Sequence, residues 1–198
     1  MQSAYPSLSN MQQLKDIQEI LKANAQPAAL AAHKKFVPGA DKLYGVRMPV
    51  LNLLSKQFKE GSFELVQALW KSGSFEEKIL AAKMLGKIAK QDPPNAIQLV
   101  KTFSMEMADW AVCDALGMQS LKPLVKTHAT AIFELAVELN TSVNLWQRRL
   151  SLVLVEWYTR DLSMHPKISK LVKALENDKE YYVKKAVQWI KRNMDKGN

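Results

Sequence analysis

Hydrophobic residues recur every three or four positions along the chain, which is the spacing of helices that bury one face. Few segments alternate between apolar and polar residues, as half-buried β-strands do. Breaks are also rare, because the 198 residues include only 7 Gly and 8 Pro. This pattern predicts an all-α fold.

The first part of the chain predicts short helices with clear breaks between them. Residues 1–10 are expected to form a flexible lead and residues 11–198 a single domain. The first helical run is expected to break near Pro27, since proline resists continuation of a helix. Turn formers predict a loop over residues 36–45. The helices predicted here span residues 11–33, 49–59 and 63–71.

Four later segments repeat at a nearly constant period, and each opens a helix with an aromatic or large apolar residue. They begin at Phe75, Trp110, Leu145 and Tyr181, which lie 35, 35 and 36 positions apart. Second helices are expected between them, at residues 95–107, 121–139 and 166–176. A helix pair of this length is the unit of HEAT-like repeats. We therefore predict an α-solenoid of HEAT-like helix pairs rather than a plain helix bundle.

Stacking of such repeats places equivalent positions of neighbouring segments side by side. The fifth residues of the four segments are Ile79, Asp114, Arg149 and Lys185. The fourth residues are Lys78, Cys113, Arg148 and Lys184. We expect this row on a concave basic face, as a groove that holds one carboxylate among cations and follows a phosphate backbone.

The charge of the chain favours a polyanionic partner. There are 28 Lys+Arg and 19 Asp+Glu, a formal net charge of +9. Such an excess favours nucleic acid over an acidic membrane surface, although an incidentally basic helical protein is the alternative. Trp189 lies in the most basic part, residues 160–198, which hold 10 basic and 5 acidic residues. An aromatic ring among cations favours stacking of a base or sugar.

Several classes of function lack their sequence signals. The single cysteine, Cys113, excludes an intramolecular disulfide, and the three scattered histidines do not match common zinc spacings. No glycine-rich nucleotide loop is present. We expect neither metal nor cofactor. No signal peptide or apolar run of about 18 residues is found, so a cytoplasmic monomer without membrane contact is expected.

Asp114 is the residue best suited to chemistry. It follows Trp110 by four positions, so the two share a helical face, and Arg149 is expected to face it from the next repeat. Nearby positive charge is expected to lower the pKa of this carboxyl and keep it ionised, ready to stabilise positive charge at a sugar carbon or orient a water. A structural salt bridge with Arg149 is the alternative. For Trp70, Trp146 and Trp157 we expect a place in the core.

Four motifs in order resemble the HEAT-repeat DNA alkylation repair proteins, the AlkD-like DNA glycosylases. They are YGVRMP at 44–49, WAVCD at 110–114, WQRR at 146–149 and KAVQWIKR at 185–192. By motif position, Asp114 matches the catalytic aspartate, Trp110 and Trp189 the active-site tryptophans, and Arg149 the arginine that holds DNA beside them. The cations near these motifs, expected to bind DNA as well, are Arg47, Arg148, Lys184, Lys185 and Arg192.

The resemblance implies hydrolysis of the N-glycosidic bond of alkylated, cationic purines in double-stranded DNA, as in base excision repair. The duplex would lie along the concave face, and the tryptophans and the aspartate would approach the deoxyribose. A cationic base leaves without protonation, so one ionised carboxylate suffices and no cofactor is needed. The chain departs from the family at Gln188, where a small residue is common. It also ends soon after Arg192, so a shortened array with a weaker hold on DNA is expected.

Two other classes of function remain open at this point. A non-catalytic solenoid would recognise damaged or branched DNA through its basic row. A protein-interaction scaffold would use the same surface for an acidic protein partner.

Overall fold

A computed structural model describes residues 8–196, and these contain helices, turns and loops but no strand. The α-helices are α1 (Leu8–Ala23), α2 (Pro27–Phe36), α3 (Met48–Gln57), α4 (Phe63–Ser72), α5 (Phe75–Ile88), α6 (Pro93–Ser104), α7 (Trp110–Gln119), α8 (Ala129–Asn140), α9 (Leu145–Leu154), α10 (His165–Ala174) and α11 (Tyr181–Asp195). Three short 3₁₀ turns are η1 (Lys122–Leu124), η2 (Glu156–Tyr158) and η3 (Leu162–Met164). None of the described helices is long and apolar enough to cross a membrane.

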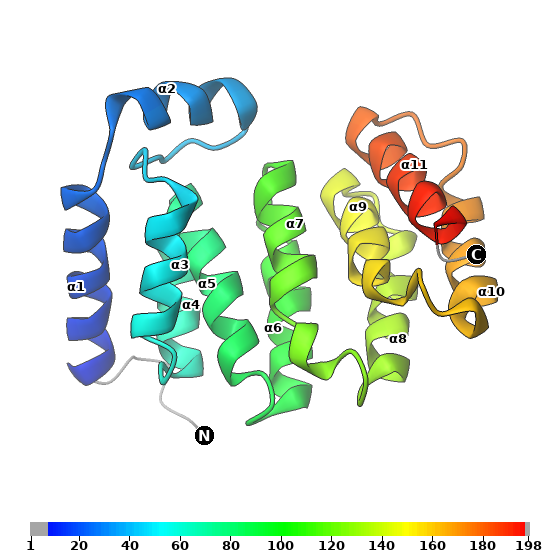
Figure 1. Cartoon of the computed structure of the whole chain (residues 1–198), viewed down its shortest axis with the longest axis horizontal. Coiled ribbons are helices and arrows are strands. Elements are labelled where there is room, and N and C mark those ends of the chain that lie inside the picture. Colours follow the sequence, from blue (N-terminus) through cyan, green and yellow to red (C-terminus); the bar gives the residue numbers. More distant parts are fainter. Residues whose placement is uncertain (1–7, 197–198) are drawn as a thin grey trace.

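The helices form an α-solenoid of two layers, as predicted. In one layer α3, α5, α7, α9 and α11 contact one another in that order. In the other layer, α1 contacts α4, and α8 contacts both α6 and α10. The array runs from α1 at one end to α10 and α11 at the other, while α2 lies across the ends of its neighbours (Figure 1). The layer of α3, α5, α7, α9 and α11 is called the odd-helix layer below.

The repeat period is confirmed by the helix starts. Helices α5, α7, α9 and α11 begin at the four residues that open the sequence repeat. A polar side chain accounts for three of these starts, because it caps the unpaired amides of the first turn. Ser74 accepts from the amide of Glu77 at 3.2 Å, Asp109 from the amide of Val112 at 2.9 Å, and Asn144 from that of Trp146 at 2.8 Å.

Two expected boundaries are wrong. Helix α1 already begins at Leu8, so the expected lead over residues 1–10 is too long; residues 1–7 lie outside the described part. Residues 121–139 are not one helix, because η1 contains Pro123, which lacks an amide hydrogen for a longer helix. The amide of His128 then bonds back to the carbonyl of Leu124 at 2.8 Å, and α8 starts afterwards.

Close packing in the odd-helix layer depends on a small residue. A Cβ on Gly86 of α5 would collide with the carbonyl oxygen of Gln119 at the end of α7. The absence of a side chain therefore lets these two helices approach. In the core, Trp70 is buried and stacks on Phe103, with ring centroids 4.3 Å apart. The core position expected for Trp70 is confirmed, whereas Trp146 and Trp157 are half-buried.

Candidate active site

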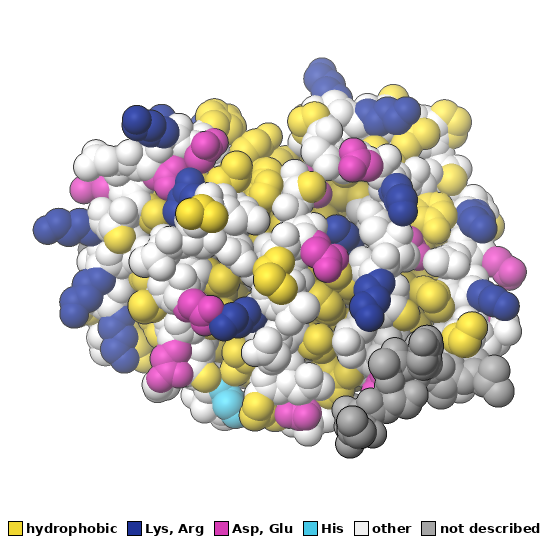
Figure 2. Space-filling model, turned by 180° about the vertical axis from the view of Figure 1, so that it is seen from behind, with side chains coloured by type: hydrophobic (Ala, Val, Ile, Leu, Met, Phe, Trp, Pro, Cys, Tyr) yellow, Lys and Arg dark blue, Asp and Glu magenta, His cyan; other side chains and the backbone are white. Residues whose placement is uncertain are grey.

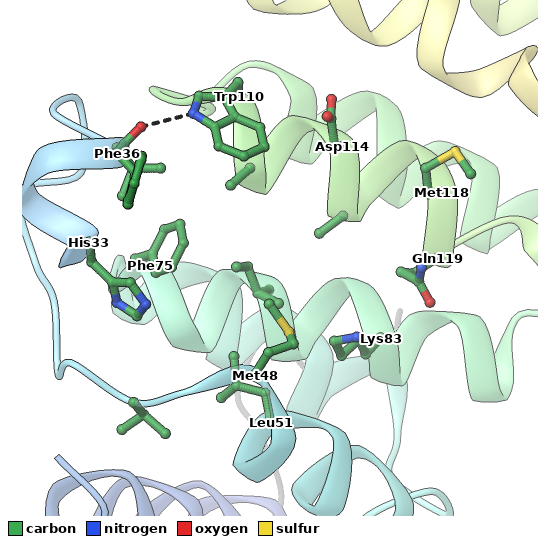
Figure 3. Close-up of a pocket in the computed structure, with 15 residues that line it drawn as sticks. His33, Phe36, Met48, Leu51, Phe75, Lys83, Trp110, Asp114, Met118 and Gln119 are labelled. Carbon is green, nitrogen blue, oxygen red and sulfur yellow. Dashed lines mark hydrogen bonds between the residues drawn. The ribbon is translucent and has the colours of Figure 1, made fainter. Parts of the chain in front are cut away.

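A cavity of about 530 Å³ opens on the odd-helix layer, between α5 and α7. The end of α2 and the loop before α3 close one end of it (Figure 3). Its wall is mostly apolar, with Met48, Phe75 and Ile79 among the lining side chains. The polar or charged side chains in the wall are His33, Lys83, Asp114 and Gln119. Trp110 also lines the cavity, one helical turn before Asp114.

Arg149 of α9 holds the carboxylate of Asp114. Its Nε and Nη2 donate to Oδ1 and Oδ2 of Asp114, each at 2.9 Å, and its Nη1 donates to the carbonyl of Tyr182 at 2.7 Å. The side chains of Arg149 and Asp114 are 8% and 27% exposed. The prediction that positions 114 and 149 lie side by side is confirmed, and one guanidinium links α7, α9 and α11.

The expected lowering of the Asp114 pKa is wrong. Burial raises the pKa of this carboxyl, and the hydrogen bonds and charge of Arg149 offset the rise only in part. The sequence indicated the cation but not the burial. The pKa of Arg149 is raised above its ordinary value. Burial acts to lower it, but the hydrogen bonds to Asp114 and the negative charge of Asp114 have the larger effect. The bidentate geometry is that of an ionised carboxylate facing a guanidinium.

Trp110 is fixed by a hydrogen bond at the end of the cavity that α2 closes. Its indole Nε1 donates to the carbonyl oxygen of Phe36 at 2.9 Å, which joins the start of α7 to the end of α2 (Figure 3). The ring is half-buried against the core, and it lines the same cavity as Asp114. The sequence prediction that the two residues share a helical face is confirmed. In the same view Asp114 points away from α5, and its carboxylate meets Arg149 of α9.

The expected basic row is not a continuous exposed groove. Ile79 and Cys113 are buried, and Lys78 donates to the carbonyl of Glu106 at 2.9 Å. Arg148 pairs with Asp178 at 2.7 Å. It also donates to the carbonyl oxygens of Ser142 and Val143. Both guanidinium groups are thus bonded within the protein, so a DNA phosphate would have to compete with these bonds. Contact of Arg148 or Arg149 with phosphate stays a prediction.

The remaining predicted DNA contacts divide between two places. Arg47 is exposed at the start of α3, between Val46 and Met48, which line the cavity. Lys184, Lys185 and Arg192 are exposed on α11. On the same helix, Trp189 is half-buried against the core and does not line the cavity that holds Asp114. The structure thus brings Trp110, Asp114 and Arg149 together but leaves Trp189 apart from the cavity.

Sequence reasoning missed Glu76, which shapes one end of the cavity. Its carboxylate is fully buried and accepts the amides of Tyr44, Gly45 and Val46 at 3.0, 2.7 and 3.0 Å. Gly45 has a φ of 82°, a conformation that suits glycine. The carboxylate therefore fixes the loop that carries Arg47. Its sequence signal was the pair of acidic residues in the first turn of α5.

His33 is the other missed residue, and it lines the cavity beside Phe75, with ring centroids 5.2 Å apart. Its Nδ1 lies 3.4 Å from Oε1 of Glu76.

Cys113 is buried and burial raises the pKa of its thiol, which suits a packing role. Within residues 8–196, no group of three His, Cys, Asp or Glu side chains is placed to hold a metal ion.

Comparison with known proteins agrees with this architecture. A family model described as DNA alkylation repair enzyme matches residues 17–198. No curated protein matches the chain. The family match covers the helical array from within α1 onward, including the cavity and the Asp114–Arg149 pair. With nearly its whole length matched, the chain belongs to the DNA alkylation repair enzyme family and has a role in the repair of alkylated DNA.

Proposed function

We propose that the protein is a DNA glycosylase that hydrolyses the N-glycosidic bond of alkylated, cationic purines in duplex DNA. The observation that carries the proposal is the Asp114 carboxylate, which Arg149 holds through both oxygens beside a cavity that Asp114 and Trp110 both line. A fixed charge of this kind stabilises a transition state without reorganising during the reaction. The 27% exposure of the Asp114 side chain leaves it open to a sugar that approaches from outside.

The reaction breaks the bond between C1′ and the base nitrogen, and the electron pair leaves with the base. Because the alkylated base is cationic, it departs neutral and needs no proton from the enzyme. Asp114 stabilises the positive charge that develops on the sugar. A water then attacks C1′ and gives its proton to the ionised Asp114 carboxylate, which releases the proton to solvent afterwards. Each carboxylate oxygen accepts one bond from Arg149 and keeps a lone pair for that water.

Arg149 acts through Asp114 in this proposal, as a positioning residue. It sets the direction of the carboxylate by two parallel hydrogen bonds, which a point charge would not do. Trp110 offers a flat apolar surface to the sugar or the neighbouring base. Trp189 and the cations of α11 lie two helices beyond α7 in the odd-helix layer, where they would contact the duplex beyond the damaged nucleotide.

The test is base release from methylated duplex DNA by the Asp114→Asn variant. Asparagine keeps the shape but removes the charge, so we expect single-turnover release to fall by about 10² to 10⁴-fold while DNA binding persists. Asp178→Asn is the matched control, since Asp178 forms the equivalent ion pair with Arg148 away from the cavity. The proposal is wrong if Asp114→Asn releases base as fast as the unaltered protein does, or if the unaltered protein releases none.

One observation favours a second candidate. Both oxygens of Asp114 are already hydrogen-bonded to Arg149, which is also the geometry of a purely structural ion pair. A non-catalytic binder of damaged DNA would then use the same face. It would bind methylated duplex without releasing base, and Asp114→Asn would change stability alone.

A further inference from the structure

A second pocket, of about 410 Å³, opens where α3, α5 and η1 meet. Its wall is polar and carries a lysine cluster that lies outside the sequence motifs and shares only Lys83 with the candidate active site. The lysine cluster consists of Lys56, Lys83, Lys87 and Lys122. No acidic side chain lines this pocket. Four cations from three separate elements therefore face one cavity.

The lysine cluster has no ion-pair partner in the part of the chain that the structure describes. None of its members forms an ion pair with any residue from 8 to 196, whereas Arg148, Arg149, Lys101 and Lys191 all do. Lys122 lies over the ring of Trp157, 4.7 Å from its centroid, which holds the ammonium group in place. Burial lowers the pKa of Lys83, and the charge of Lys87 lowers it further. The fold thus holds like charges together, an arrangement that a bound anion would stabilise.

One face of the molecule carries charges of both signs in a mixed pattern. On the side of the molecule opposite to that of Figure 1, Lys and Arg are scattered among Asp, Glu and apolar side chains (Figure 2). On this face the basic side chains do not form a continuous positive surface. An acid-free pocket with four lysines is a specific feature of this edge of the odd-helix layer.

The lysine cluster is continuous with the candidate active site. Lys83 and Gln119 line both pockets. Gln119 follows Asp114 by five residues on α7, which corresponds to about 7.5 Å along the helix axis. Phosphates of one DNA strand are spaced about 3.4 Å apart along the duplex axis. A strand that passes Asp114 along α7 would reach the lysine cluster about two nucleotides later.

We propose that the lysine cluster binds phosphodiester groups of the DNA strand whose damaged nucleotide lies at Asp114, about two nucleotides from that nucleotide. The inference rests on the proposed function for its position along the strand. The phosphate chemistry itself rests only on the four lysines and the acid-free wall. Lysine supplies strong point-charge donors for phosphate, and such contacts position the duplex without reading its sequence.

The first test is the salt dependence of binding to an undamaged labelled duplex. The double variant Lys87→Gln/Lys122→Gln is compared with Lys71→Gln/Lys173→Gln, which removes two exposed charges outside the pocket. We expect the first pair to weaken binding and to reduce the slope of log K against log salt by about 1 to 2, since each lost phosphate contact removes about 0.9. Equal slopes for the two double variants would overturn the assignment.

The second test locates the contact. Single phosphates on either side of a damaged nucleotide are replaced by uncharged methylphosphonates. The unaltered protein should lose affinity at a phosphate about two nucleotides away, and Lys87→Gln/Lys122→Gln should be insensitive there. Inorganic phosphate that competes as well as duplex DNA would instead indicate a site for free phosphate. If Asp114→Asn leaves base release unchanged, the glycosylase proposal fails, but the binding results for the lysine cluster still hold. The two proposals can therefore fail independently of each other.

Discussion

Arg149 donates to both carboxylate oxygens of Asp114 at 2.9 Å, and its third contact, at 2.7 Å, is the carbonyl oxygen of Tyr182. One buried side chain from α9 therefore sets the direction of a carboxylate on α7 and anchors the first turn of α11. Loss of this arginine affects the site and the solenoid together. The two effects are separable by variants that keep the charge or remove it.

Arg149→Gln should impair both folding and base release. It leaves a largely buried carboxyl without its cation, which costs about 3 kcal/mol in the free energy of unfolding. Without Arg149 nothing offsets the burial that raises the Asp114 pKa, so that pKa rises further. Release requires the ionised form, so the acidic limb of the pH–rate profile should move to higher pH. Urea unfolding and single-turnover rates across pH measure the two effects.

Arg149→Lys separates charge from geometry. Lysine keeps a positive charge near Asp114 but lacks the planar fork for two parallel bonds. The acidic limb should therefore shift less than in Arg149→Gln, while the rate at its plateau still falls. Identical pH profiles for the two variants would contradict the role of Arg149 as a charged positioning residue.

Trp110→Phe tests the bond between α7 and α2. Phenylalanine keeps an aromatic ring in the cavity wall but removes the donor to the carbonyl of Phe36, at a cost of about 1 kcal/mol. We expect modest loss of stability and partial loss of release, with a larger loss of release in Trp110→Ala because the ring itself is gone. Trp157→Phe is a control outside the cavity. Equal release by Trp110→Ala and the unaltered protein would exclude a role for the ring.

Glu76→Gln should destabilise the loop before α3. The carboxylate accepts from three amides, those of Gly45 and Val46 at Oε1 and that of Tyr44 at Oε2. A glutamine that keeps the Oε1 acceptor places its NH₂ against the Tyr44 amide, so two donors face each other. The expected cost is about 1 to 3 kcal/mol, measured by urea unfolding. Arg47 lies in this loop, so DNA binding should weaken as well. Glu64→Gln, in the first turn of α4, should leave both quantities nearly unchanged.

The sequence predicted the solenoid well because residues close together in the chain determine where each helix of the repeat begins. A large apolar residue opens each helix of the repeat, and Ser74, Asp109 and Asn144 cap three of them. Those signals also predicted that positions 114 and 149 lie side by side. They said nothing of how deeply each position is buried. That is why the row expected as a basic groove contains the buried Ile79 and Cys113.

The site residues that the sequence missed depend on contacts between distant segments. Glu76 accepts amides from residues about 30 positions earlier, and His33 reaches the cavity because α2 folds across its end. The lysine cluster joins α3, α5 and η1, whose lysines show no common motif. Burial also decided the sign of the Asp114 pKa shift. The sequence indicates the charge of Arg149, which lowers this pKa, but not the burial, which raises it.

Asp114 and Asp178, both paired with arginine, should respond to pH with opposite signs. Burial raises the pKa of Asp178, but hydrogen bonds from Arg148 and the Glu180 amide, with nearby positive charge, outweigh it and hold that pKa below its ordinary value. Ionised Asp178 therefore stabilises the fold above about pH 4, and this contribution is lost as pH falls through the folded pKa. The stability difference between the unaltered protein and Asp178→Asn should shrink on acidification.

For Asp114 the folded pKa lies above the ordinary value, so ionisation costs stability, and the cost disappears as pH falls below about 4. Relative to Asp114→Asn, the unaltered protein should thus gain stability on acidification. Urea unfolding of the three proteins at matched pH values from about 3 to 7 measures both differences. Parallel changes for the two variants would show that burial does not govern Asp114. Opposite changes would mark Asp114 as the carboxyl that the fold holds ready to accept a proton.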